Sequence, residues 1–125
     1  MPTILLLEDE ATDRALIRRA VFATDHTLIE AEALEDVADH IACRHIDLVI
    51  ISLATISDGV LPTFQRLVSQ MPGTRILALT PAQGADRLTT LLKAESLGAH
   101  HLLPKPIDPQ QLLTILNLTF PLPTQ

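Results

Sequence analysis

The stretch DLVIISLATISDG, from Asp47 to Gly59, contains an apolar run that ends in a small hydroxyl side chain. The run Leu48 to Ile51 consists of branched aliphatic residues, and Ser52 follows it directly. A short apolar run of this kind is typical of a strand that is buried on both faces of a sheet. Ser52 is therefore expected at the edge of the sheet, where this strand ends.

The rest of the chain alternates similar short apolar runs with longer segments of helical periodicity. Strands are expected at residues 3–8, 26–31, 47–52, 75–80 and 99–104. Helices are expected at residues 11–23, 33–45, 60–71, 85–98 and 108–120. This alternation predicts an α/β fold in which helices cover both faces of one parallel sheet. Right-handed crossovers then bring the carboxyl ends of all strands to one edge, where such sheets bind ligands.

Helical periodicity also predicts which side chains are buried. Four residues of the first helix lie on one stripe and are expected to face the core: Ala15, Leu16, Ala20 and Val21. Cys43, in the second helix, is expected to be a buried small apolar side chain. At the start of the last helix, Asp108 is expected to be the N-cap, with Pro109 at the first helical position.

Composition excludes several classes of protein. The chain has 125 residues, of which 47% are hydrophobic, so one domain with a well-filled core is expected. The formal net charge of −6 argues against a nucleic-acid partner. The apolar runs are too short for a membrane span, and the first residues do not form a signal peptide. The single cysteine fits a reducing compartment, so a cytoplasmic location is predicted.

Polar residues with complementary chemistry follow the expected strands. Glu8 and Asp9 follow the first strand, Ser52 and Thr80 end the third and fourth, and Lys105 follows the fifth. Two adjacent carboxylates suit a hard cation such as Mg²⁺. A threonine hydroxyl and a lysine ammonium suit a phosphoryl group. The sequence therefore places a site for a metal and a phosphoryl group at this edge.

Four segments resemble the motifs of receiver domains of two-component response regulators. They are ILLLEDE (4–10), DLVIISL (47–53), ILALT (76–80) and GAHHLLPKPID (98–108). The resemblance covers nearly the whole chain and implies a flavodoxin-like, doubly wound sheet of five parallel strands in the order 2-1-3-4-5, with five helices. The receiver domain is assigned to residues 1–120 and a short tail to residues 121–125.

The resemblance also implies a role for each residue at the edge. Glu8 and Asp9 match the acidic pair that holds Mg²⁺, Thr80 matches the hydroxyl that senses the phosphoryl group, and Lys105 matches the lysine that contacts it. The bond between Lys105 and Pro106 is expected to be cis. Ser52 stands where the family has its phosphoacceptor aspartate. Leu102 stands where the family has an aromatic residue that switches on phosphorylation.

These departures favour a degenerate receiver, a pseudo-receiver that is not an enzyme and acts through protein contacts without aspartyl phosphorylation. A serine hydroxyl is not ionised at neutral pH and needs a base to attack phosphorus. The resemblance implies that the acceptor aspartate is also a metal ligand, a third carboxylate beside Glu8 and Asp9. With Ser52 in its place, Mg²⁺ binding by Glu8 and Asp9 is expected to be weak or lost, so no cofactor is expected. The expected partner is a histidine kinase, a phosphotransfer protein or an output domain. A homodimer through the Leu91–Leu116 region is a further expectation.

Other interpretations stay open at this point. The chain could still accept a phosphoryl group, at Ser52 or at Asp58, or carry an altered acceptor site. A nucleotide- or flavin-binding module of similar topology is disfavoured because no glycine-rich loop follows the first strand. Three arginines of the first helix form either a solvated face or a docking surface: Arg14, Arg18 and Arg19.

Overall fold

A computed structural model of the chain describes residues 2–24, 26–55, 59, 61–70, 73–81 and 87–120. Its strands are β1 (Thr3–Leu7), β2 (Thr27–Ala31), β3 (Leu48–Ser52), β4 (Arg75–Thr80) and β5 (His101–Pro104). Its helices are α1 (Ala11–Ala23), α2 (Leu34–Cys43), α3 (Leu61–Ser69), α4 (Arg87–Leu97) and α5 (Pro109–Thr119), with a 3₁₀ turn η1 (Leu53–Thr55) after β3. Within these ranges no helix is long and apolar enough to cross a bilayer.

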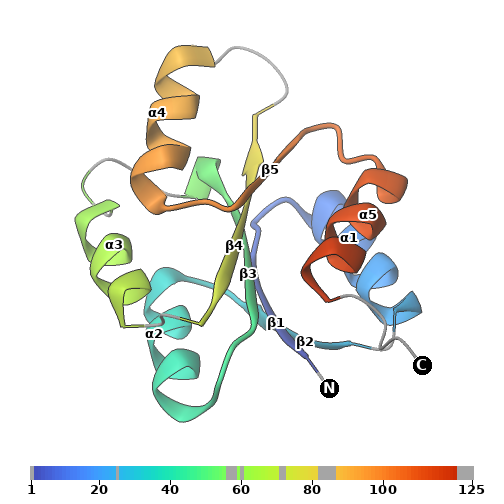
Figure 1. Ribbon diagram of the computed structural model, residues 1–125, viewed down its shortest axis with the longest axis horizontal. Coiled ribbons are helices and arrows are strands. Elements are labelled where there is room, and N and C mark those ends of the chain that lie inside the picture. The colour runs from blue at the N-terminus through green and yellow to red at the C-terminus, as the bar shows by residue number, and fades with distance from the viewer. Residues whose placement is uncertain are drawn as a thin grey trace.

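The strands form one parallel sheet in the order β2-β1-β3-β4-β5, as predicted. Figure 1 shows this sheet nearly edge-on, with α1 and α5 on one face and α2, α3 and α4 on the other. Helices on both faces bury the interior of the central strands, and every residue of β3 is buried. The apolar character of these strands therefore follows from the three-layer arrangement.

Alternate side chains of each central strand enter two separate cores. In β1, Ile4 and Leu6 pack with Ile17 of α1 and with apolar residues of α5. Leu5 and Leu7 face the other way, into a core that contains Phe64 of α3 and residues of α2 and α4. One apolar run thus supplies both cores, which is why its composition does not alternate.

Two of the predictions about burial were wrong. Ala15 is exposed, whereas Ile17, which the predicted stripe omitted, is fully buried. The face of α1 that meets the sheet is centred on Ile17, Ala20 and Val21. Cys43 is exposed because α2 ends at this residue and reaches the core through Val37 instead.

The boundaries of the last two helices have clear local causes. The Asp108 carboxylate accepts a hydrogen bond of 2.9 Å from the backbone N–H of Gln110, and Pro109 is the first helical residue, so the predicted N-cap is confirmed. Gly98 follows α4 with φ of 76°, a left-handed conformation that ends helices and favours glycine.

We expect Gly98→Ala to lower the free energy of unfolding by about 1 kcal/mol, because alanine pays a steric penalty at positive φ. A Cβ at Gly98 would meet nothing within 4 Å, so crowding adds nothing to this cost. The matched control is Gly73→Ala, whose Cβ would lie in ordinary contact, 3.8 Å from His45 Cε1, without a positive φ. Urea unfolding measures both variants, and equal losses would contradict the explanation.

Candidate functional site

Four of the predicted site residues lie at the carboxyl edge of the sheet. Glu8 comes directly after β1, Ser52 ends β3, Thr80 ends β4 and Lys105 comes directly after β5. The strands that carry them are neighbours, since β3 pairs with both β1 and β4, and β4 pairs with β5. The parallel sheet thus brings residues from distant parts of the chain to one rim, as the strand assignments predict.

Glu8 is a buried carboxylate that meets the Lys105 ammonium. Its side chain has no exposed surface, and Lys105 Nζ lies 2.9 Å from Glu8 Oε2. The other oxygen, Oε1, accepts a hydrogen bond of 3.0 Å from the backbone N–H of Glu10. No hydrogen bond of favourable angle reaches Oε2 within the described residues, so the ion pair with Lys105 is what compensates the burial of this oxygen.

A second carboxylate, Asp13 in the first turn of α1, also contacts Lys105. Asp13 Oδ2 lies 3.1 Å from Lys105 Nζ, and the two side chains are 19% and 17% exposed. Sequence reasoning missed this residue because it looked only at strand ends. The signal was present, since α1 begins at the same edge and a carboxylate in its first turn lies close to that edge.

The Lys105 ammonium is held in its charged form by these two carboxylates. Burial alone would lower the pKa of Lys105, but close contact with Glu8 and Asp13 and their negative charges outweigh it, so the pKa is raised above its ordinary value of 10.5. A raised pKa of Lys105 means that, from neutral pH up to 10.5, the ion pairs contribute their full stabilisation to the fold. This stabilisation is lost only as the pH rises through the raised pKa of Lys105.

Ser52 is almost completely buried, with 1% of its surface exposed. Its carbonyl oxygen accepts a hydrogen bond of 2.6 Å from the Thr55 hydroxyl, which closes the 3₁₀ turn η1. Ser52 is not an ion-pair partner of Lys105. Among the described residues those partners are Glu8, which follows β1, and Asp13 of α1. No hydrogen bond there joins the Ser52 hydroxyl to a histidine or carboxylate that could act as a general base.

Within the described residues, the rim offers few free carboxylate oxygens to a magnesium ion. Both oxygens of Glu8 are engaged, Asp9 is exposed, and Ser52 offers a neutral hydroxyl where a third carboxylate would be needed. In the described part of the chain, no group of three or more histidine, cysteine, aspartate or glutamate side chains is arranged to hold a metal.

The other predicted positions also lie near this edge. Thr80 is partly exposed, and its carbonyl oxygen accepts a hydrogen bond of 2.9 Å from the backbone N–H of Lys105. The Lys105–Pro106 bond is cis, as predicted. Leu102, predicted to stand at the switch position, lies in β5 and is 41% exposed. Asp58 lies outside the described residues.

The arginines of α1 are divided between two environments. Arg18 donates two hydrogen bonds to Glu30 of β2, of 2.9 Å from Nε and 2.7 Å from Nη2, and Arg14 Nε lies 3.9 Å from the same carboxylate. The hydrogen bond and charge of Arg18 lower the pKa of Glu30. Arg19 instead lines a groove between α1 and α5. Of the three, Arg14 and Arg18 are therefore engaged within the fold.

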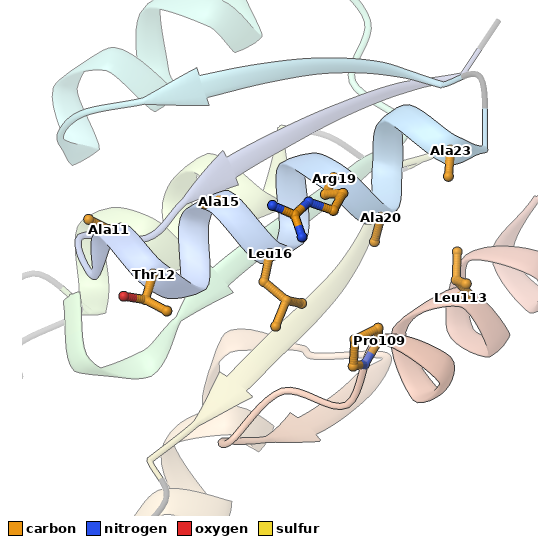
Figure 2. A pocket seen from close by; sticks show the side chains of 9 residues that line it. All are labelled: Ala11, Thr12, Ala15, Leu16, Arg19, Ala20, Ala23, Pro109 and Leu113. Carbon is orange, nitrogen blue, oxygen red and sulfur yellow. The ribbon is translucent and has the colours of Figure 1, made fainter.

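The groove between α1 and α5 has a volume of about 720 Å³ and is mainly apolar. In Figure 2, Leu16 extends from α1 toward α5, where Pro109 and Leu113 lie. Its lining includes none of Ser52, Thr80 or Lys105, so the groove is separate from the charged rim.

The family of the chain follows from comparison with known proteins. The sequence model of the family described as response regulator receiver domain matches residues 4–117, so this chain belongs to that family. It is a receiver domain of two-component signal transduction. Such domains are in general signalling modules without enzymatic activity, and they interact with kinases, phosphotransfer proteins or output domains. No curated protein matches the chain.

Solved structures share the fold at low sequence identity. A response regulator from Thermotoga maritima has a TM-score of 0.80 at 18% identity, covering 95% of this chain and 97% of that one. The receiver domain of an HD domain-containing protein from Pseudomonas fluorescens has a TM-score of 0.81 at 24% identity, covering 94% and 85%. The chemotaxis response regulator CheY4 of Vibrio cholerae has a TM-score of 0.77 at 20% identity, covering 96% and 99%.

We expect Lys105→Met to lower the free energy of unfolding by about 2–3 kcal/mol at neutral pH, because the variant leaves the Glu8 carboxylate buried without a counter-ion. Chemical denaturation measures the loss. The double variant Glu8→Gln with Lys105→Met removes the unpaired charge and should recover at least about 1 kcal/mol relative to Lys105→Met alone. If the loss in the double variant equals the sum of the losses in Glu8→Gln and in Lys105→Met, the assignment of the ion pair is contradicted.

Proposed function

We propose that this receiver domain signals through protein contacts without phosphorylation of an aspartate. The observation that carries the proposal is the buried serine that ends β3, which we take to stand at the position of the family's phosphoacceptor. An aspartate at this position would be ionised at neutral pH and could attack a phosphodonor directly. A serine hydroxyl needs a base, and the described surroundings of Ser52 provide none.

The charges at the rim support the same proposal. Lys105 would have to contact an incoming phosphoryl group, but its ammonium already has two carboxylate partners, Glu8 and Asp13. The surroundings of Lys105 are therefore negative, which disfavours a phosphoryl anion. In our proposal, a rim held by these ion pairs presents one conformation to a protein partner. We take the location of the protein to be the cytoplasm. The partner would be a histidine kinase, a phosphotransfer protein or an output domain.

Incubation of the protein with acetyl phosphate and Mg²⁺ should leave its intact mass unchanged. The physical reason is the absence of an ionised nucleophile at residue 52. Mass spectrometry of the whole chain measures the outcome. Ser52→Asp is the matched positive control, since it restores a carboxylate at the end of β3.

Each possible gain of mass in the parent protein has a definite meaning. A stoichiometric phosphoryl group that hydroxylamine removes would identify an acyl phosphate, for example at Asp58, and would contradict the proposal. A group that resists hydroxylamine and disappears in Ser52→Ala would identify phosphoserine and would equally contradict it. No gain in the parent together with a gain in Ser52→Asp is the expected result.

Magnesium should stabilise the parent protein little, because its rim lacks a third carboxylate and Glu8 is already paired with Lys105. Ser52→Asp should be less stable than the parent in chelator and should regain stability in millimolar Mg²⁺, since a ligand that binds the native state stabilises it. Thermal melts of both proteins in chelator and in Mg²⁺ make the comparison. An equal gain in the parent would show that the metal site does not need residue 52.

We also propose that the chain forms a homodimer through the Leu91–Leu116 region. This region includes Leu91, Leu92 and Leu102, which are 42%, 54% and 41% exposed. Covering these side chains would remove apolar surface from water. The dimer would be constitutive, because no phosphorylation controls it.

Sedimentation velocity should detect the dimer at high protein concentration, and Leu92→Glu should shift the equilibrium to monomer because it places a charge in the contact. Phe22→Glu is the matched control, since Phe22 is an exposed apolar residue on α1, at 86% exposure. A parent that stays monomeric, or a dimer that both variants weaken equally, would rule out this region as the interface.

A further inference from the structure

We infer that Asp13 replaces the missing acceptor carboxylate as a permanent counter-ion of Lys105. This inference rests on the proposed function, because it takes Ser52 to occupy the position of a lost aspartate. It makes Asp13 a positioning residue that fixes the lysine, and it explains how the rim keeps its charge balance without a carboxylate on β3.

The geometry of the rim supports this role for Asp13. The Lys105 ammonium is mostly buried and lies 2.9 Å from Glu8 Oε2 and 3.1 Å from Asp13 Oδ2. A buried ammonium needs close partners, because burial without them is costly. Glu8 supplies one partner from the end of β1, and Ser52 offers only a neutral hydroxyl at the end of β3. Asp13 supplies the second negative charge from α1.

The source of this carboxylate has a structural consequence. Asp13 lies in the first turn of α1, and Lys105 lies in the turn between β5 and α5. Their ion pair therefore links the first turn of α1 to the turn that leads into α5. In the proposed role, the Asp13 carboxylate is not a phosphoacceptor, so it is not converted to an acyl phosphate and its charge on Lys105 does not change with phosphorylation.

A double-mutant cycle in chelator tests the exchange of one carboxylate for another. Asp13→Asn should destabilise the protein by removing a partner of Lys105, and Ser52→Asp should destabilise it by adding a charge beside Glu8 and Asp13. The double variant only relocates the carboxylate. Its unfolding equilibrium constant should therefore be at least about tenfold smaller than the product of the two single-variant changes predicts. Additive effects would overturn the inference.

The matched control removes a carboxylate from the first turn of another helix. Glu35 is an exposed residue in the first turn of α2. Combined with Ser52→Asp, Glu35→Gln should give additive effects, because Glu35 belongs to another helix and is not a partner of Lys105. The same recovery in this control would assign the effect to net charge and would overturn the role of Asp13.

A second readout follows Lys105 itself and does not depend on Ser52→Asp being folded. Titration of the Lys105 side chain by NMR should give a lower pKa in Asp13→Asn than in the parent, and Asp13→Glu should restore it at least in part. An unchanged pKa in Asp13→Asn would overturn the inference. Phosphorylation of the parent by acetyl phosphate would instead refute the proposed function, so the two failures are distinguishable.

Discussion

Burial of the central strands on both faces is the constraint from which the rest of the structure follows. Side chains of β1, β3 and β4 enter two cores in alternation, so polar groups are confined almost entirely to the strand ends. In a parallel sheet, those ends gather at one edge. The charged rim of this receiver domain is thus a consequence of where the sheet can accept polar side chains.

The same constraint explains the electrostatics of the rim. Glu8 follows β1 so closely that its side chain is fully buried, and a buried carboxylate needs a counter-ion. Lys105 supplies it from the turn after the edge strand β5, and Asp13 supplies a second carboxylate from α1. The ammonium of Lys105 is thus balanced by carboxylates from β1 and α1, while β3 ends in a neutral serine.

Much of the fold could be predicted from the sequence because the relevant signals are local. Apolar runs marked the strands, and Asp108 with Pro109 marked the start of α5. The positions of Glu8, Ser52, Thr80 and Lys105 at one edge followed from strand ends alone. Their chemical roles came from the resemblance to receiver domains, which local patterns do not provide.

The remaining features depend on tertiary placement. Asp13 was missed because its contact with Lys105 joins segments about ninety residues apart in the chain, as expected for an edge built from crossovers. The exposure of Ala15 depends on the rotation of α1 about its axis, which apolar spacing fixes only approximately. Cys43 is exposed because α2 ends there, and helix ends are poorly defined by sequence.

The central claim is that the rim exists in one state that phosphodonors do not change. A nitrogen–proton correlation spectrum of the full chain, recorded before and after addition of Mg²⁺ and acetyl phosphate, tests this most directly. We expect the backbone amide signals of Ser52, Thr80 and Lys105 to keep their positions. A second set of signals for these residues, appearing with the phosphodonor and disappearing as it is consumed, would contradict it.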